Sequence, residues 1–116
     1  MARMPKRMAG PALVATGPAT IYTAPSYIPN TLVSVIRHIH ISNPSGSAVT
    51  ITLSIGADAA GTRILTTFSI PAAAAGVTGS VVDYFCYYPM TTGEILTASS
   101  GSNNVLVITV SGDENV

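Results

Sequence analysis

Apolar and polar residues alternate over several short segments of this chain, and the longest of these segments is 31–42. It is rich in β-branched and apolar residues and contains no Gly or Pro, which favours a packed β-strand. Alternation divides its side chains into two faces. One face carries Val33, Val35, Arg37, Ile39 and Ile41, and the other carries Leu32, Ser34, Ile36, His38 and His40. We expect the first face to line a core and the mixed second face to be available to another subunit.

Seven further strands are expected from the same alternation and from the Gly, Pro, Asn and Ser residues that separate them. Their expected bounds are 11–16, 20–24, 49–55, 63–70, 80–88, 94–99 and 105–111. The 49–55 segment follows 31–42 after a short turn, so we expect these two strands to form a hairpin. The whole pattern predicts an all-β fold: a single antiparallel β-sandwich or jelly roll of about eight strands.

The two ends of the chain lack this alternation. Residues 1–10 hold three of the five basic residues and are interrupted by Pro and Gly, which predicts an extended basic arm. Such an arm either lies on a neighbouring subunit or an acidic surface, or frays as chain ends commonly do. We expect residues 113–116 to form an acidic tail, so that 11–112 is the sandwich domain.

Charged residues make up only 9% of the chain, against roughly 25% in an ordinary globular domain. Small uncharged polar residues or other subunits must therefore cover the surface. The net charge is zero at pH 7, which does not favour a lone, highly soluble monomer. This composition predicts a component of a large assembly, and we expect a homo-oligomer. A soluble enzyme with few charges is the alternative.

Two kinds of partner are not expected from the distribution of charge and apolar residues. Three basic residues in an arm without aromatic neighbours neutralise few phosphates, so nucleic-acid binding is not expected. The apolar stretches are too short to span a membrane. Gly10 and Pro11 interrupt the stretch that follows the basic residues, so no secretory signal is expected either.

Cys86 is the single cysteine, so no intrachain disulfide can form, which fits assembly in a reducing compartment. It lies inside an expected strand between Phe85 and Tyr87, where a free cysteine acts as a small hydrophobic residue rather than a catalytic thiol.

His38 and His40 share one face of their expected strand because they lie two residues apart. Two imidazoles at this spacing can supply half of a metal site, which copies around a symmetry axis would complete. No acidic or cysteine ligand lies nearby in sequence. The alternative is a pair of half-buried histidines satisfied by hydrogen bonds, and we assign no metal and no cofactor.

Arg37 and Asp83 are charged residues in the middle of otherwise apolar expected strands. A cross-strand pair between them would explain both. Otherwise, each points to solvent or to a neighbouring molecule.

An aromatic cluster lies in the 80–88 strand. Tyrosine is favoured at protein interfaces and in carbohydrate platforms because one end is apolar and the other polar; ordinary packing in the core and at edges is the alternative. The candidate interface residues are Arg3, Lys6, Arg7, Tyr84, Tyr87 and Tyr88.

Sequence motifs for catalysis are absent. The chain has no Gly-x-Ser-x-Gly elbow, no phosphate-binding glycine loop and no His-Glu-x-x-His pattern. Its five acidic residues are dispersed and offer no obvious carboxylate pair. We therefore assign no catalytic residue.

Several stretches carry a resemblance to a known class of proteins. They are Ile-Tyr-Thr-Ala-Pro at 21–25, Ile-His-Ile-Ser-Asn-Pro-Ser-Gly at 39–46, Val-Thr-Ile-Thr-Leu-Ser-Ile-Gly at 49–56, Ile-Pro-Ala at 70–72 and Val-Ile-Thr-Val-Ser-Gly-Asp-Glu at 107–114. From about residue 16 to 114 the layout resembles small virion structural proteins of tailed bacteriophages. The resemblance implies a β-sandwich, often trimeric, that binds other virion subunits and catalyses nothing. It brings no residue-level site with it.

We therefore expect a non-enzymatic virion protein, assembled in the host bacterial cytoplasm. A capsid decoration (cement) protein bound to major capsid subunits is the first hypothesis. A tail or tail-tip component, including a sandwich that binds carbohydrate on the host surface, is the alternative. A small hydrolase or metal enzyme is the third hypothesis, and it would need His38 and His40 exposed in a pocket with a third ligand.

Overall fold

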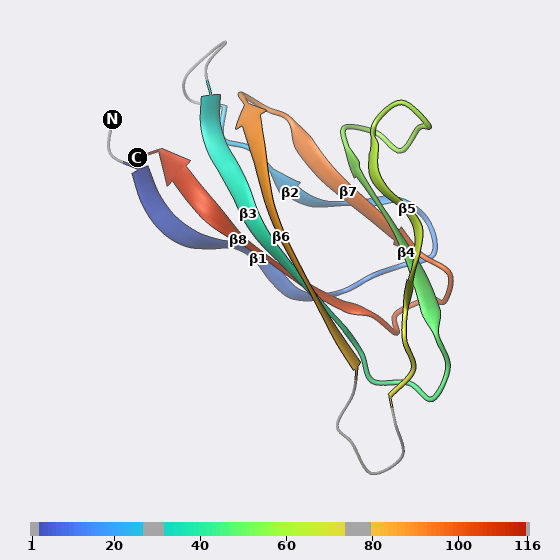
Figure 1. Ribbon diagram of the computed structural model, residues 1–116. Helices are drawn as coiled ribbons and strands as arrows, with labels where there is room; N and C mark the ends of the chain where they lie inside the picture. Colours follow the sequence, from blue (N-terminus) through green and yellow to red (C-terminus); the bar gives the residue numbers. More distant parts are fainter. Residues whose placement is uncertain (1–2, 27–31, 74–79, 116) are drawn as a thin grey trace.

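The computed structural model describes residues 3–26, 32–73 and 80–115, which form eight β-strands and no helix. The strands are β1 (Arg3–Leu13), β2 (Ala19–Thr23), β3 (Leu32–Asn43), β4 (Val49–Ile55), β5 (Arg63–Ile70), β6 (Ser80–Thr91), β7 (Ile95–Ser100) and β8 (Val107–Asn115). They build two four-stranded antiparallel sheets, ordered β1-β8-β3-β6 and β2-β7-β4-β5, which lie as two layers in Figure 1. The expected all-β sandwich is confirmed, and β4 and β5 have the expected bounds. Within the described ranges, no helix has the length and apolar character that a membrane span needs.

The strands pair from the outside of the chain inwards. β1 pairs with β8, β2 with β7, β3 with β6 and β4 with β5. This nested antiparallel pairing is that of a jelly roll. In such a fold most consecutive strands belong to opposite sheets, and here only β4 and β5 are consecutive neighbours in one sheet.

The expected hairpin between the 31–42 and 49–55 segments is wrong, because β3 and β4 belong to different sheets. The side chain of Asn43 shapes the connection: its Nδ2 donates to the carbonyl oxygens of Ser47, Ile70 and Pro71. These bonds hold the end of β3 against the end of β5, so the chain crosses to the second sheet. Asn, Pro, Ser and Gly define a tight turn, but they do not decide whether the next strand pairs or crosses.

Apolar side chains from both sheets fill the space between the layers. Burying a side chain of this kind contributes about 1.5–3 kcal/mol, whereas an exposed ion pair contributes about 0–1 kcal/mol, so this core dominates the stability of the fold. The four apolar residues expected on the core face of β3 are all buried. The largest fully buried side chains include Ile36, Ile39, Ile41, Ile51, Leu53, Ile70, Met90, Leu96, Leu106 and Ile108.

A β-bulge in β3 interrupts the alternation at Arg37. Ile36 lies opposite Gly112 of β8 and His38 lies opposite Ser111, so Arg37 is the extra residue on β3. The bulge turns Arg37 to the outer face, where it is exposed, and places Ile36 in the core. The expected inward position of Arg37 and outward position of Ile36 are therefore wrong.

The expected N-terminal arm is wrong for residues 3–10, which belong to β1; residues 1–2 lie outside the described residues. β1 pairs along its length with β8, from Arg3 opposite Asn115 to Leu13 opposite Val107. As an edge strand it tolerates proline, which cannot donate to a neighbour. The register shifts around Gly10, so the Gly-Pro step sits at an irregularity rather than at a strand end.

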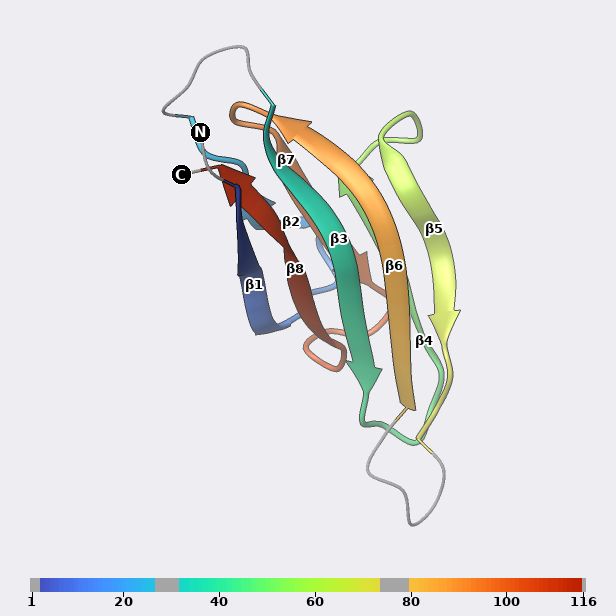
Figure 2. The same cartoon turned by 60° about the vertical axis from the view of Figure 1, so that its left-hand side comes forward.

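The expected acidic tail is also wrong for residues 113–115, because β8 continues to Asn115; residue 116 lies outside the described part. Asp113 and Glu114 both form ion pairs with residues of neighbouring strands. The sandwich therefore extends beyond 11–112 at both ends, and these ends lie side by side in Figure 2.

Candidate functional site

The outer face of the β1-β8-β3-β6 sheet carries the chemically distinctive side chains. In the antiparallel register, His40 of β3 lies opposite Asp83 of β6, and His38 lies opposite Phe85. Side chains alternate along β6, so Asp83, Phe85 and Tyr87 are exposed while the residues between them are partly buried. Asp83, Phe85 and Tyr87 thus share the outer face of β6.

His38, His40 and Asp83 form what we call the His–Asp cluster. One carboxylate oxygen, Asp83 Oδ1, lies 2.8 Å from His38 Nε2 and 2.7 Å from His40 Nδ1. An ionised carboxylate only accepts hydrogen bonds, so both ring nitrogens donate to it. These bonds, with that from His40 the larger and that from His38 second, lower the pKa of Asp83 and favour its ionised form.

Phe85 fixes the position of one of the two imidazoles. Its ring stacks on His38 with centroids 4.5 Å apart and an interplanar angle of 11°. Phe85 is itself 75% exposed, so it offers one face to His38 and most of its remaining surface to the surroundings. The His–Asp cluster therefore has an apolar ring beside His38 on its β6 side.

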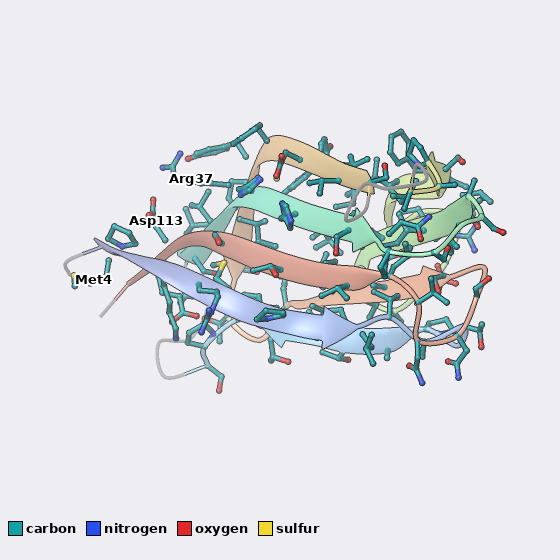
Figure 3. The ribbon with its side chains drawn as sticks, turned by 90° about the horizontal axis from the view of Figure 1, so that it is seen from below. Met4, Arg37 and Asp113 are labelled. Atoms are coloured by element: carbon teal, nitrogen blue, oxygen red, sulfur yellow. The ribbon has the colours of Figure 1, made fainter. Side chains whose placement is uncertain are left out.

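Arg37 pairs with Asp113 rather than with Asp83, so the expected Arg37–Asp83 pair is wrong. Arg37 Nε donates to Asp113 Oδ2 at 2.6 Å, and its guanidinium lies 5.3 Å from the centre of the Tyr87 ring. Figure 3 shows Arg37 and Asp113 on one face of the molecule. The β3 bulge turns Arg37 to the outer face beside the C-terminal part of β8, whereas Asp83 lies opposite His40, further along β3.

The three candidate tyrosines divide between the two faces of β6. Tyr87 is 61% exposed on the outer face, whereas Tyr84 and Tyr88 are half-buried, pack against the core and hydrogen-bond through their hydroxyls. Burial, followed by the hydrogen bond with Tyr84, raises the pKa of Tyr88 to about 12. Cys86 shares this inner face, and burial raises the pKa of its thiol, as a hydrophobic packing role predicts.

The three candidate basic residues lie on β1, at the opposite edge of the same sheet from β6. Lys6 pairs with Glu114 of β8 at 2.9 Å, and Arg7 is exposed. The side chain of Arg3 lies outside the described part of the structure. The interface role of these three residues stays a prediction.

Asp83 is the residue of the cluster that sequence reasoning missed. Its place opposite His40 depends on which strands pair and in which register, and no local pattern in the sequence specifies either. The metal-ligating atoms of His38, His40 and Asp83 all lie within 4.8 Å of one another. The third ligand that a metal site on this face requires therefore comes from the same chain. The described residues enclose no pocket.

No protein-family model matches this sequence, and a search of curated proteins gives no match either.

Proposed function

We propose that this chain is a non-enzymatic structural protein of a tailed-bacteriophage virion. In this role it is a capsid decoration protein that binds other virion subunits through the outer face of β6. The observation that carries the proposal is three large exposed side chains on that face, which lie on both sides of the charged Asp83: Val81, Phe85 and Tyr87 are 51%, 75% and 61% exposed.

The size of this apolar surface supports a docking role. An aromatic side chain buries about 150–250 Å², at about 25 cal/mol per Å². Covering Phe85 and Tyr87 with a partner therefore contributes on the order of 5 kcal/mol before the costs of association. Aromatic residues of this kind commonly dominate binding energies at interfaces.

The composition and the fold also support a structural role in a virion. With only 9% charged residues, the molecule has little ionic surface to keep it apart from its neighbours. The jelly roll is a fold of viral capsid domains, although fold alone is a weak argument for function. The resemblance of residues 16–114 to phage virion proteins supplies the particular class. β6 is also an edge strand of its sheet, and such an edge can pair with a strand of a neighbouring subunit or copy.

This proposed function can be tested on purified particles of the virus that encodes the chain. Mass spectrometry of purified virions is expected to detect the protein at a fixed ratio to the major capsid subunit. A double variant, Phe85→Ser with Tyr87→Ser, is expected to fold normally but to be lost from the particles. Phe68→Ser is the matched control, because Phe68 is 42% exposed on the other sheet. Absence of the wild-type protein from intact virions contradicts the proposal.

A carbohydrate-binding role in a tail tip is the second candidate. It is favoured by the position of the exposed Phe85 and Tyr87 rings beside the polar groups of Asp83 and Arg37, since sugars stack on such rings while polar groups bind their hydroxyls. A glycan array with the purified chain separates the two roles, because a decoration protein is expected to show no sugar selectivity.

A further inference from the structure

We propose that His38, His40 and Asp83 bind a divalent transition-metal ion of the zinc class on the outer face of the β1-β8-β3-β6 sheet. This inference stands on the geometry of the His–Asp cluster and does not depend on a virion role. Three potential ligand atoms, His38 Nε2, His40 Nδ1 and an Asp83 carboxylate oxygen, converge within 4.8 Å.

The types of ligand select the class of metal. Two imidazole nitrogens and one carboxylate oxygen form a set that zinc commonly takes, together with a fourth ligand from water or another molecule. Calcium and magnesium prefer sites made of oxygen ligands, so they are expected to bind here weakly or not at all. Among divalent first-row metals, copper and nickel are the closest competitors for such a site.

Rotations of the three side chains are needed to admit the ion. Tetrahedral zinc with bonds of about 2.0–2.1 Å separates its ligand atoms by about 3.3 Å. The two nitrogen–oxygen distances are now 2.8 and 2.7 Å, so each must lengthen by about 0.5 Å to reach the ~3.3 Å of a zinc site. The two ring nitrogens, which lie within 4.8 Å of each other, must come to the same separation. The three side chains are 29%, 39% and 43% exposed, which leaves room for these rotations.

The proton balance of binding is simple. Each ring nitrogen that now donates to Asp83 Oδ1 would bind the metal through its lone pair, and each neutral ring would carry its proton on the other nitrogen. The carboxylate is already favoured in its ionised form. The ion therefore replaces two hydrogen bonds with three coordinate bonds.

The backbone and one neighbouring ring hold the ligands in place beforehand. His40 and Asp83 are directly opposite each other on paired strands, and His38 is stacked against Phe85. A site on a rigid sheet is positioned more accurately than one on loops.

Titration of the full-length chain without a histidine tag tests the proposal. Calorimetry with zinc chloride is expected to give one ion per chain, and cobalt(II) is expected to give the visible spectrum of a four-coordinate site. The chain suits this test because its two histidines are both in the cluster, and its one cysteine lies on the inner face of β6. Cys86→Ser is expected to leave binding unchanged, which excludes the thiol as a ligand.

The variants give the decisive comparison. Asp83→Asn and His40→Gln are each expected to weaken zinc binding at least tenfold, in line with the loss of one of three ligands. Asp113→Asn is the matched control, since this carboxylate lies on the same face but pairs with Arg37. Absence of zinc and cobalt binding to the wild-type chain overturns the proposal, and so does an equal loss of affinity in Asp113→Asn and Asp83→Asn.

Discussion

The hydroxyl of Tyr22 donates a 2.6 Å hydrogen bond to Oε2 of Glu114, which joins β2 of one sheet to β8 of the other. Lys6 of β1 donates to the second carboxylate oxygen, Oε1, at 2.9 Å. Glu114 is only 8% exposed, so both of its oxygens are satisfied within the protein. A residue that the sequence places in a charged tail thus connects three strands across the sandwich.

Stability is expected to fall in acid because of Glu114. Burial alone would raise the pKa of this carboxyl, but the hydrogen bonds from Tyr22 and Lys6 outweigh burial and lower the pKa below its usual value of 4.5. A lowered pKa in the folded state means that the stabilisation is complete above the unfolded pKa. It is lost as the pH falls through the folded pKa.

The Glu114→Gln variant measures this effect. At about pH 6 it is expected to be less stable than the wild type by about 1–3 kcal/mol in urea unfolding, because a hydrogen-bonded buried charge is lost. At lower pH the difference is expected to shrink, because the stabilisation by the charged carboxylate is lost as the pH falls below the unfolded pKa and through the lowered folded pKa. A difference that stays constant over this range would show that the charge of Glu114 contributes nothing.

Gly112→Ala is expected to destabilise the sandwich strongly. A Cβ atom at Gly112 would lie 2.0 Å from the carbonyl oxygen of Val35, a backbone atom of β3 that cannot rotate away. Overpacking of this kind costs about 1–3 kcal/mol or more, and thermal unfolding is the measurement. Gly61→Ala is the control, because a Cβ there meets nothing within 4 Å. Equal melting temperatures for the two variants would contradict the close approach of β3 and β8 at the bulge.

Deletion of residues 1–10 is expected to destabilise the whole domain. It removes most of β1, leaves β8 without one neighbour and removes the Lys6 partner of Glu114. Urea unfolding of the truncated chain is expected to have a lower midpoint than that of the full chain. An unchanged midpoint would restore the interpretation of this segment as a separate arm.

Local patterns in the sequence predict the strands well but not their partners. The alternation at 49–55 and 63–70 gives β4 and β5 with the bounds that the structure has, because a half-buried strand needs a period of two. Pairing of β1 with β8 joins residues about a hundred positions apart, and no local pattern specifies it. For the same reason the proline and glycine of 1–10 suggested an arm, although an edge strand with an irregular register accommodates both.

Local sequence patterns also fail to predict which residues meet on the outer face of the β1-β8-β3-β6 sheet. His38 and His40 were predicted to share a face, and they do. Asp83 joins them through the register of β3 and β6, and the bulge at Arg37 directs that side chain to Asp113 instead. A bulge depends on the fit between neighbouring strands, so the alternation of β3 alone gave the wrong partner for Arg37.

We expect another subunit to cover the outer face of β6 in the virion. Hydroxyl-radical footprinting of Phe85 and Tyr87, in purified virions and in the isolated chain, measures this directly. We predict that both rings are oxidised much more slowly in virions, while Phe68 on the other sheet keeps a similar rate in both samples. Equal oxidation of Phe85 and Tyr87 in virions and in the isolated chain would contradict the claim.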